Sequence, residues 1–528
     1  MKELDKSIDK RPIRVNPSVP STIPKFVDEL PIMPKAKAAN PYEGDNYYEI
    51  EMKEGRHSFH KAFPLTRIWG YCGIYPGPTI EALRDRDIYV RWINNLPFRH
   101  FLPVDKTLHG SIGTPEVRTV VHLHGANVAS DSDGSPDAWY TRNYAFTGKA
   151  FRNKVYKYTN HQPSATLWYH DHSLGTTRLN VYAGLAGLYI LKDLNEMTLG
   201  LPEGEYDIPL LIQDRTFKED GSLFYPEGPN PPVSVSPSVV PAFLGNTIAV
   251  NGKLWPYLEV EPRKYRFRIV NGSNTRGYIF ALENGEDFIQ IGTDGGFLHH
   301  PAVINSFELE PAERIDLVID FSKYKGESFK LLNTDEPEDE NLGVIMEFRV
   351  TKRLKGEDKS KVPEMLYPEE HLDEAMAERV RLLPLSASQD HYGRPMLLLD
   401  GRMWSDPVTE TPMLDSIEVW KFINTTPFPH PIHIHLVQFR ILSRQAYDVE
   451  RYLNGEGLFL IGDPIPPRDF EKGWKDTMKA EPGMVSSVIM QFKDHVGDYV
   501  WHCHILEHED HDMMRPIRVV DIGIKEEF

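Results

Sequence analysis

The pattern His-X-His occurs four times in this chain, twice in the first third and twice near the end. The four pairs are His122 and His124, His170 and His172, His433 and His435, and His502 and His504. Each pair lies in or beside an apolar run, as in VVHLHG and LWYHDH, which is typical of a strand. On a strand, residues i and i+2 face the same side about 6.6 Å apart. This spacing is too wide for easy chelation of one ion but suits two adjacent ions.

A single pair of this kind is more often two solvated or hydrogen-bonded side chains than a metal site. Eight imidazoles in apolar strands, however, would be costly to desolvate without partners. For the four pairs together, convergence on metal is therefore the better interpretation. Because the pairs come from the two ends of the chain, we expect a multinuclear cluster at the interface of a first and a last domain.

The stretch YVWHCHILEH, residues 499–508, adds a cysteine between two of these histidines. Strand alternation would place Cys503 on the face opposite His502 and His504. A thiolate with two imidazoles and a distant methionine is the ligand set of a blue-copper electron-transfer site. The candidates for such a site are Cys503, His508, Met513 and one further histidine, for which His430 is available. The peptide bonds of Cys503 would then join two metal centres.

Other metals explain the pattern less well. A structural zinc site is closed by four ligands, commonly including several cysteines, whereas one cysteine accompanies ten candidate histidines here. A binuclear hydrolase needs bridging carboxylates, and the four His-X-His pairs together with residues 499–508 contain only Asp171 and Glu507 as acids. Iron held by two histidines and one carboxylate would need far fewer imidazoles. Copper is the favoured hypothesis.

The length of 528 residues predicts about three domains. Forty-two prolines, frequent glycines and short β-branched or aromatic runs indicate many short strands joined by turns, hence an all-β chain of sandwiches or barrels. We expect a first domain over residues 1–195, which includes an irregular arm to about residue 45. A middle, structural domain would cover 196–352. A charged linker over 353–381, with a short helix after Pro368, would lead to the third domain, 382–528.

The net charge of −18 and the lack of a basic cluster argue against nucleic acid or an anionic membrane as partner. No stretch approaches the roughly 20 apolar residues of a membrane span, and the charged N-terminus has no signal-peptide core. These features predict cytoplasmic synthesis. The chain has two cysteines. If Cys503 binds metal, Cys72 has no intramolecular partner, and we expect it to pack as a small buried apolar residue.

The motifs HLHG (122–125), WYHDH (168–172), HPIHIH (430–435) and HCHILEHEDHDMM (502–514) resemble the copper-binding signatures of multicopper oxidases in order and spacing. Longer stretches, including TRIWGYCGIYPGPTIEA, GWKDTM and YVWHCHILEHEDHDMMRP, are similar to the laccases of bacterial endospore coats. The resemblance runs from about residue 25 to about residue 520. It implies three cupredoxin-like Greek-key β domains and four coppers: one type 1, one type 2 and a type 3 pair.

Carried over by position, the resemblance implies a set of ligands for each copper. Type 1 would take His430, Cys503, His508 and the weak axial Met513, with Met514 as the neighbouring alternative; type 2 would take His122 and His433; type 3 would take His124, His170 and His504 on one side and His172, His435 and His502 on the other. Two acids, Glu509 and Asp133, match residues that supply protons in the spore-coat laccases.

The implied activity is that of a laccase, which oxidises phenols, aromatic amines and tetrapyrroles such as bilirubin by single electrons and reduces O2 to two waters. The implied partners are O2, small aromatic reductants and other spore-coat proteins, and the implied location is the spore coat. One alternative is a metallo-oxidase acting on Cu(I) or Mn(II), although the fifteen methionines are scattered and form no insert. Another is a structural coat protein with incidental copper, which intact ligand positions disfavour.

Two departures from the resemblance concern the substrate cleft. Leu244 occupies the position of the first cysteine of a cleft disulfide. The approach to His430, NTTPFPH, carries Phe428 and two prolines. Substrate preference therefore cannot be transferred.

Overall fold

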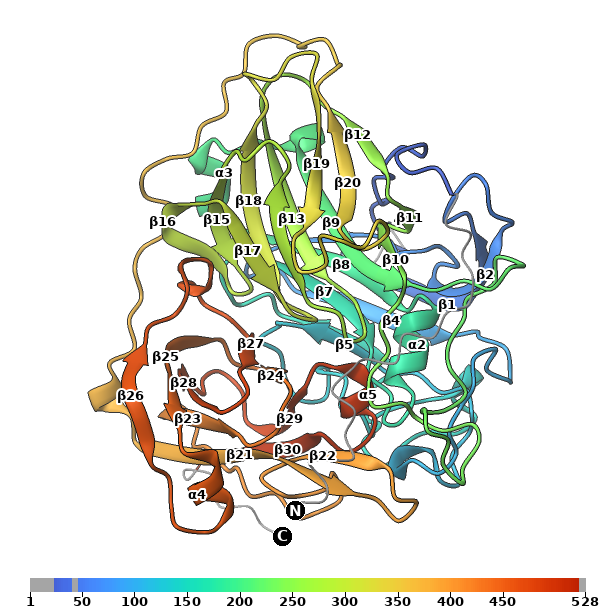
Figure 1. Ribbon diagram of the computed structural model, residues 1–528, viewed down its shortest axis with the longest axis vertical. Coiled ribbons are helices and arrows are strands. Elements are labelled where there is room, and N and C mark those ends of the chain that lie inside the picture. Colours follow the sequence, from blue (N-terminus) through green and yellow to red (C-terminus); the bar gives the residue numbers. More distant parts are fainter. Residues whose placement is uncertain (1–22, 40–45, 522–528) are drawn as a thin grey trace.

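The structure is a computed structural model that describes residues 23–39 and 46–521. Six β-sheets pack in three pairs, one pair after another along the chain (Figure 1). Helices are short: α2 (Thr177–Ala183), α3 (Leu194–Leu199), α4 (Val449–Leu453) and α5 (Leu506–Glu509), with single 3-10 turns at η1 (His109–Ser111), η2 (Arg142–Tyr144), η3 (Gly204–Tyr206), η4 (Glu374–Met376) and η5 (Asp469–Glu471). This confirms the expected all-β architecture.

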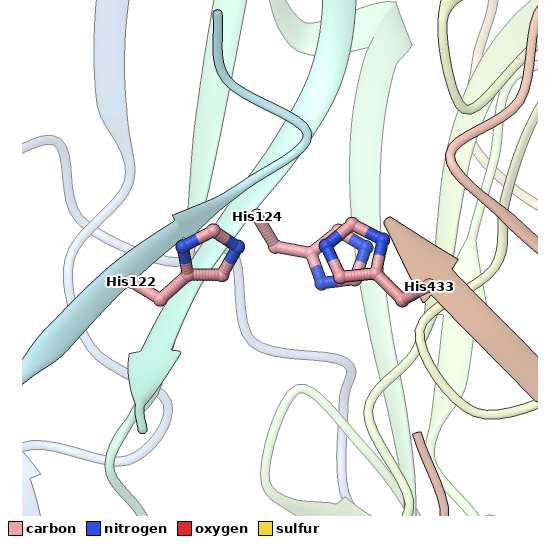
Figure 2. A group of neighbouring side chains, drawn as sticks. All are labelled: His122, His124 and His433. Atoms are coloured by element: carbon pink, nitrogen blue, oxygen red, sulfur yellow. The ribbon is translucent and has the colours of Figure 1, made fainter. Parts of the chain in front are cut away.

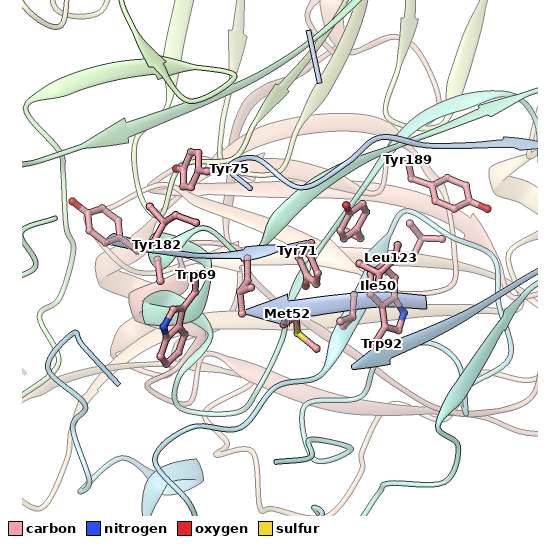
Figure 3. Packing of buried hydrophobic residues seen from close by; sticks show 14 of the residues in the cluster. Ile50, Met52, Trp69, Tyr71, Tyr75, Trp92, Leu123, Tyr182 and Tyr189 are labelled. Atoms are coloured by element: carbon pink, nitrogen blue, oxygen red, sulfur yellow. The ribbon is translucent and has the colours of Figure 1, made fainter. Parts of the chain in front are cut away.

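The first sandwich pairs two four-stranded sheets. Their orders are β2 (Thr66–Tyr71), β1 (Tyr47–His57), β4 (Ile88–Asn94), β6 (Val155–Tyr158), and β3 (Ile80–Leu83), β8 (Ala186–Lys192), β7 (Ala165–Asp171), β5 (Val121–His124). Along β4 every second residue is buried, as period-two alternation requires. Figure 3 shows Ile50, Met52, Trp69, Trp92 and Leu123 in the core that these strands enclose.

The middle sandwich has larger sheets of seven and five strands. Their orders are β11 (Lys253–Leu254), β10 (Thr247–Val250), β9 (Asp207–Arg215), β13 (Lys264–Asn271), β18 (Arg314–Asp320), β15 (Phe288–Thr293), β16 (Gly296–Ile304), and β12 (Tyr257–Glu259), β20 (Val344–Arg349), β19 (Ser328–Asn333), β14 (Tyr278–Leu282), β17 (Ser306–Leu309). Phenylalanines such as Phe267, Phe321 and Phe348 fill its core, and their rings lie 5.2–6.3 Å apart.

The third sandwich pairs sheets of six and four strands. Their orders are β22 (Pro395–Leu399), β21 (Arg379–Gln389), β23 (Ile417–Asn424), β28 (Met484–Gln491), β25 (Phe439–Tyr447), β26 (Leu460–Ile465), and β27 (Thr477–Ala480), β24 (His430–Ile434), β29 (Gly497–Cys503), β30 (Met514–Val519). Tyr499, Trp501, Cys503 and Ile505 all enter its core. The alternation predicted for residues 499–505 is confirmed.

The expected N-terminal arm is described only over residues 23–39, so its remainder lies outside the described residues. The described part crosses from the middle sandwich to the first. The amide of Leu30 donates to the carbonyl of Tyr257 at 2.7 Å, and that of Ala36 donates to Thr79 at 2.8 Å. The arm therefore ties two sandwiches together.

Two sequence expectations were wrong. The segment after Pro368 forms a single 3-10 turn at η4 rather than a helix. The preceding part of the linker is held extended on β16, where Leu366 donates its amide to the carbonyl of His299 at 2.9 Å. Cys72 is exposed, because it occupies a turn after β2 with a left-handed φ of 58°. Both outcomes depend on tertiary contacts or turn geometry that local composition does not specify.

Among the described residues, no helix is long and apolar enough to cross a membrane.

Candidate metal centre

All four His-X-His pairs lie at the junction of the first and third sandwiches. In the first sandwich, β5 pairs with β7 so that His122 lies opposite His170; in the third, β24 pairs with β29 so that His433 lies opposite His502. Strand pairing thus aligns one histidine pair across the strands of each sheet, whereas His124 lies opposite Trp168. All eight side chains are almost fully buried.

The ring nitrogens form three groups whose ligand atoms all lie within 4.8 Å of one another. These groups are His122, His124 and His433; His124, His170 and His504; and His172, His435 and His502. Figure 2 shows the first group, in which His124 from β5 meets His433 from β24. Their rings stack with centroids 3.7 Å apart. Ring centroids within the four pairs lie 4.9–5.8 Å apart, closer than the roughly 6.6 Å expected along a strand.

Backbone carbonyls hold four of these rings in one tautomer. The Nδ1 atoms of His122, His170, His433 and His502 donate to the carbonyls of Asp133, Asp171, Asp476 and Cys503 at 2.7, 2.9, 2.8 and 3.1 Å. A neutral imidazole has one N–H, so the Nε2 atom of each ring keeps its lone pair. A fixed tautomer with one free lone pair is what a metal ligand requires.

Seven buried ring nitrogens of this cluster have no hydrogen-bond partner among the described residues. They are His122 Nε2, His124 Nδ1, His170 Nε2, His172 Nδ1, His433 Nε2, and both Nδ1 and Nε2 of His504. An unsatisfied buried polar group costs about 1–3 kcal/mol. Burial also lowers the pKa of all eight imidazoles and so favours the neutral form that binds metal. The donor set fits a cluster of late transition metals.

A second, separate donor set lies on the other face of β29. The Sγ atom of Cys503 is 3.6 Å from Nδ1 of His430 and 3.6 Å from Nδ1 of His508. Cys503 and His430 are fully buried, whereas His508 keeps 7% of its surface exposed. One soft thiolate donor between two imidazoles fits copper. His508 is therefore the ligand through which a molecule in solvent could reach this site.

The structure separates the two methionines that the sequence left as alternatives. Met513 packs in the same core as Cys503, and its carbonyl accepts the amide of Cys503 at 3.1 Å. Met514 packs with Leu174 and Trp404 in a different cluster. This arrangement favours Met513 as the neighbour of the thiolate.

The two candidate proton donors both touch the histidine cluster. The Oδ2 atom of Asp133 lies 2.8 Å from His435 Nδ1. The carboxylate of Glu509 lies 3.3 Å from His172 Nδ1 and 3.1 Å from His502 Nδ1. Burial raises the pKa of Asp133 well above its usual range and raises that of Glu509 to about 8, against the opposing effect of His172. Both groups can therefore hold a proton near neutral pH.

Sequence reasoning missed the residues that orient these ligands. The hydroxyl of Thr426 donates to Asn424 Oδ1 at 2.8 Å and lies 2.7 Å from His430 Nε2. It therefore accepts from Nε2 and leaves Nδ1 free to face Cys503. Asp476 has a similar role towards His124 and His433. The sequence GWKDTM, which contains Asp476, carried a resemblance but no assigned role.

Residues 114–196 and 375–522 match two sequence families, both described as multicopper oxidase. The chain is 52% identical to a laccase of Bacillus subtilis, over 95% of this chain and 99% of that protein. It is 50% identical to a laccase of Bacillus stratosphericus, over 94% and 99% of the two chains. A solved multi-copper oxidase from Pediococcus acidilactici superposes with a TM-score of 0.75 at 26% identity, covering 95% of this chain and 93% of that one.

Proposed function

The chain belongs to the multicopper oxidase family, and on that premise we propose that it works as a laccase on phenols and aromatic amines. It is a copper-dependent oxidoreductase. The observation that carries the proposal is the pair of donor sets on opposite faces of β29. Cys503 lies between His430 and His508, and its sequence neighbours His502 and His504 belong to the cluster. One tripeptide thus joins a site for single electrons to a site for O2.

The donor sets support four coppers. His430, Cys503, His508 and Met513 would hold type 1; His122 and His433 would hold type 2; His124, His170 and His504, and His172, His435 and His502, would hold the type 3 pair. When bound, copper takes single electrons from the reductant and reduces O2 to water.

The protein's own groups would orient the ligands and move protons. Backbone carbonyls and Thr426 fix the free nitrogen of their histidines. Asp133 Oδ2 contacts His435, the Glu509 carboxylate contacts His502, and both acids would supply protons to the oxygen side of the reaction. Burial of both acids excludes bulk water, so the protons would come from these carboxyl groups.

The reductant would dock at the rim around His508. The carbonyl of Pro241 accepts a hydrogen bond from the His508 ring, and the side chain of Pro241 is exposed. Leu244, three residues on, occupies the position of a cysteine in the resembling laccases, and both cysteines of this chain are free. We therefore propose that no disulfide bond closes the substrate rim around His508.

The copper-loaded chain tests this function. We expect about four coppers per chain, an intense blue colour and O2 uptake with phenols or aromatic amines. A steady-state screen should include bilirubin, Cu(I) and Mn(II), with O2 consumption as the readout. A colourless, zinc-loaded protein without O2 uptake would refute the assignment.

A metallo-oxidase has less support, because the two Bacillus relatives are laccases. Faster turnover of Cu(I) or Mn(II) than of every phenol in the same screen would favour it. The similarity to a Bacillus laccase also motivates the spore coat as the location, with other coat proteins as partners. Fractionation of sporulating cells would test that part separately from the chemistry.

Replacing Asp133 by Asn should slow O2 reduction by about tenfold while the blue colour remains. The amide still accepts from His435 Nδ1 but cannot release a proton. The reoxidation rate of the fully reduced enzyme after mixing with O2 is the measurement. Asp131→Asn, at an exposed acid two residues away, is the matched control. Equal reoxidation rates in both variants would remove Asp133 from the proton path.

A further inference from the structure

We propose that Arg314 of the middle sandwich is a positioning residue for the histidine cluster, acting through Asp476 on one type 2 ligand, His433, and one type 3 ligand, His124. This proposal rests on the proposed function, since it takes His433 and His124 as copper ligands. Arg314 begins β18, and Asp476 immediately precedes β27 of the third sandwich. The middle sandwich, which supplies none of the candidate ligands, would thereby determine how two of them face the metal.

Arg314 holds the Asp476 carboxylate with two parallel hydrogen bonds. Its Nη1 atom donates to Oδ1 at 2.5 Å, and its Nη2 atom donates to Oδ2 at 2.6 Å. Its Nε atom donates to the carbonyl of Thr166 in the first sandwich at 3.0 Å. A planar guanidinium in this fork geometry fixes both the position and the plane of a carboxylate. Arg314, which lies in the middle sandwich, therefore connects Asp476 of the third sandwich to Thr166 of the first.

Asp476 in turn determines the tautomer of two stacked histidines in opposite ways. Its Oδ1 atom accepts from His124 Nε2 at 3.1 Å, and its backbone carbonyl accepts from His433 Nδ1 at 2.8 Å. The nitrogens left with lone pairs are His124 Nδ1 and His433 Nε2. Both are among the buried nitrogens without a hydrogen-bond partner in the described part of the chain. Asp476 thus leaves Nδ1 of His124 and Nε2 of His433 free to bind metal in the cluster.

Gly125 of the HLHG motif shows how closely this pair approaches the ligands. A Cβ atom at Gly125 would lie 2.5 Å from Arg314 Nη2 and 2.6 Å from Asp476 Oδ2. Its φ of +86° also disfavours any other residue. The glycine beside His124 is therefore required by the Arg314–Asp476 pair as well as by the turn.

The surroundings of the pair contain further buried charges. Asp294 accepts the Arg314 amide at 2.7 Å and lies 3.0 Å from Lys475 Nζ, which is 3.1 Å from Glu313. With Asp476 they make a group of two basic and three acidic side chains, in which burial raises the pKa of Glu313. Shortening Arg314 would leave Asp476 without its bidentate partner, and its carboxylate could then rotate away from His124.

The test compares Arg314→Lys with Arg268→Lys in the copper-loaded enzyme. Arg268 is the matched control because it is equally buried, donates to Asp207 at 2.8 and 2.9 Å, and touches no ligand. In Arg314→Lys we expect the copper of the histidine cluster to bind 10- to 100-fold more weakly. Total copper should fall below four per chain and the type 2 signal in electron paramagnetic resonance should decrease, while the blue type 1 absorption persists. Arg268→Lys should keep both signals even if its unfolding midpoint falls.

A wild-type copper content and type 2 signal in Arg314→Lys would overturn the proposal, as would equal loss of all coppers from both variants. If Arg314→Lys does not fold, the Asp476→Asn variant tests the proposal instead. Its amide would give its oxygen to Arg314 and turn its NH2 group towards His124, so the same selective loss is expected. Absence of a type 2 signal from the unmodified protein would instead refute the proposed function.

Discussion

Replacing Cys503 by Ser should abolish the blue colour and the oxidase activity together. Cys503 Sγ is the sulfur that would bind copper as a thiolate, and it lies 3.6 Å from both His430 Nδ1 and His508 Nδ1. A serine hydroxyl is smaller and harder, and it remains protonated in a fully buried position. We expect no visible absorption from type 1 copper and O2 uptake at background, measured on protein of known copper content.

Cys72→Ser provides the control for this substitution. Cys72 is the other cysteine of the chain and is exposed in a turn. We expect its serine variant to keep the colour, the copper content and the activity of the unmodified protein. Loss of colour in Cys72→Ser, or a blue and active Cys503→Ser, would contradict the assignment of the thiolate.

The alternation of residues 499–505 was predictable because a strand has a fixed period of two. Once Cys503 faces a core with Tyr499 and Trp501, His502 and His504 must face the other way. The same argument placed the other three pairs on strands. The structure has His122, His124, His170 and His433 on strands, whereas β7 ends at Asp171 and β24 at Ile434, one residue before His172 and His435. The all-β architecture was predictable from turn residues and short β-branched runs for a similar reason: both signals are local.

What could not be predicted depends on contacts between distant segments. Arg314 and Asp476 are separated by 162 positions and meet only when the three sandwiches pack. Thr426 is four residues from His430, yet its role depends on the hydroxyl being committed to Asn424. Gly125 follows a ligand motif directly, and a glycine there indicates that another group packs closely against the backbone. The sequence did not show that this group is the Arg314–Asp476 pair. The expectation for Cys72 was wrong because it followed the usual burial of a free cysteine, whereas Cys72 is exposed in a turn.

Replacing Glu509 by Gln should slow O2 reduction by about 100-fold while the blue colour is retained. The carboxyl group contacts His172 and His502 at 3.3 and 3.1 Å and is fully buried. With a pKa raised by burial to about 8, it is mostly protonated at neutral pH and can donate. A glutamine keeps the shape but has no acidic proton, and general acid catalysis contributes roughly 10²–10⁴-fold. The separate rates of anaerobic bleaching by a phenol and of reoxidation by O2 are the measurement.

Glu507→Gln separates proton transfer from simple disruption of α5. Glu507 lies in the same short helix and is equally buried, but it accepts from Tyr225, Asn274 and Thr275 at 2.7–2.9 Å instead of touching the cluster. Loss of one of its acceptor oxygens should lower the unfolding midpoint without slowing reoxidation of the blue enzyme. If Glu509→Gln reoxidises as fast as Glu507→Gln, protons reach O2 by another route. If both variants lose the blue colour, the helix rather than the carboxyl group is at fault, and the proton assignment fails. A reoxidation defect confined to Glu509→Gln, with normal anaerobic bleaching, can come only from the oxygen side of the reaction.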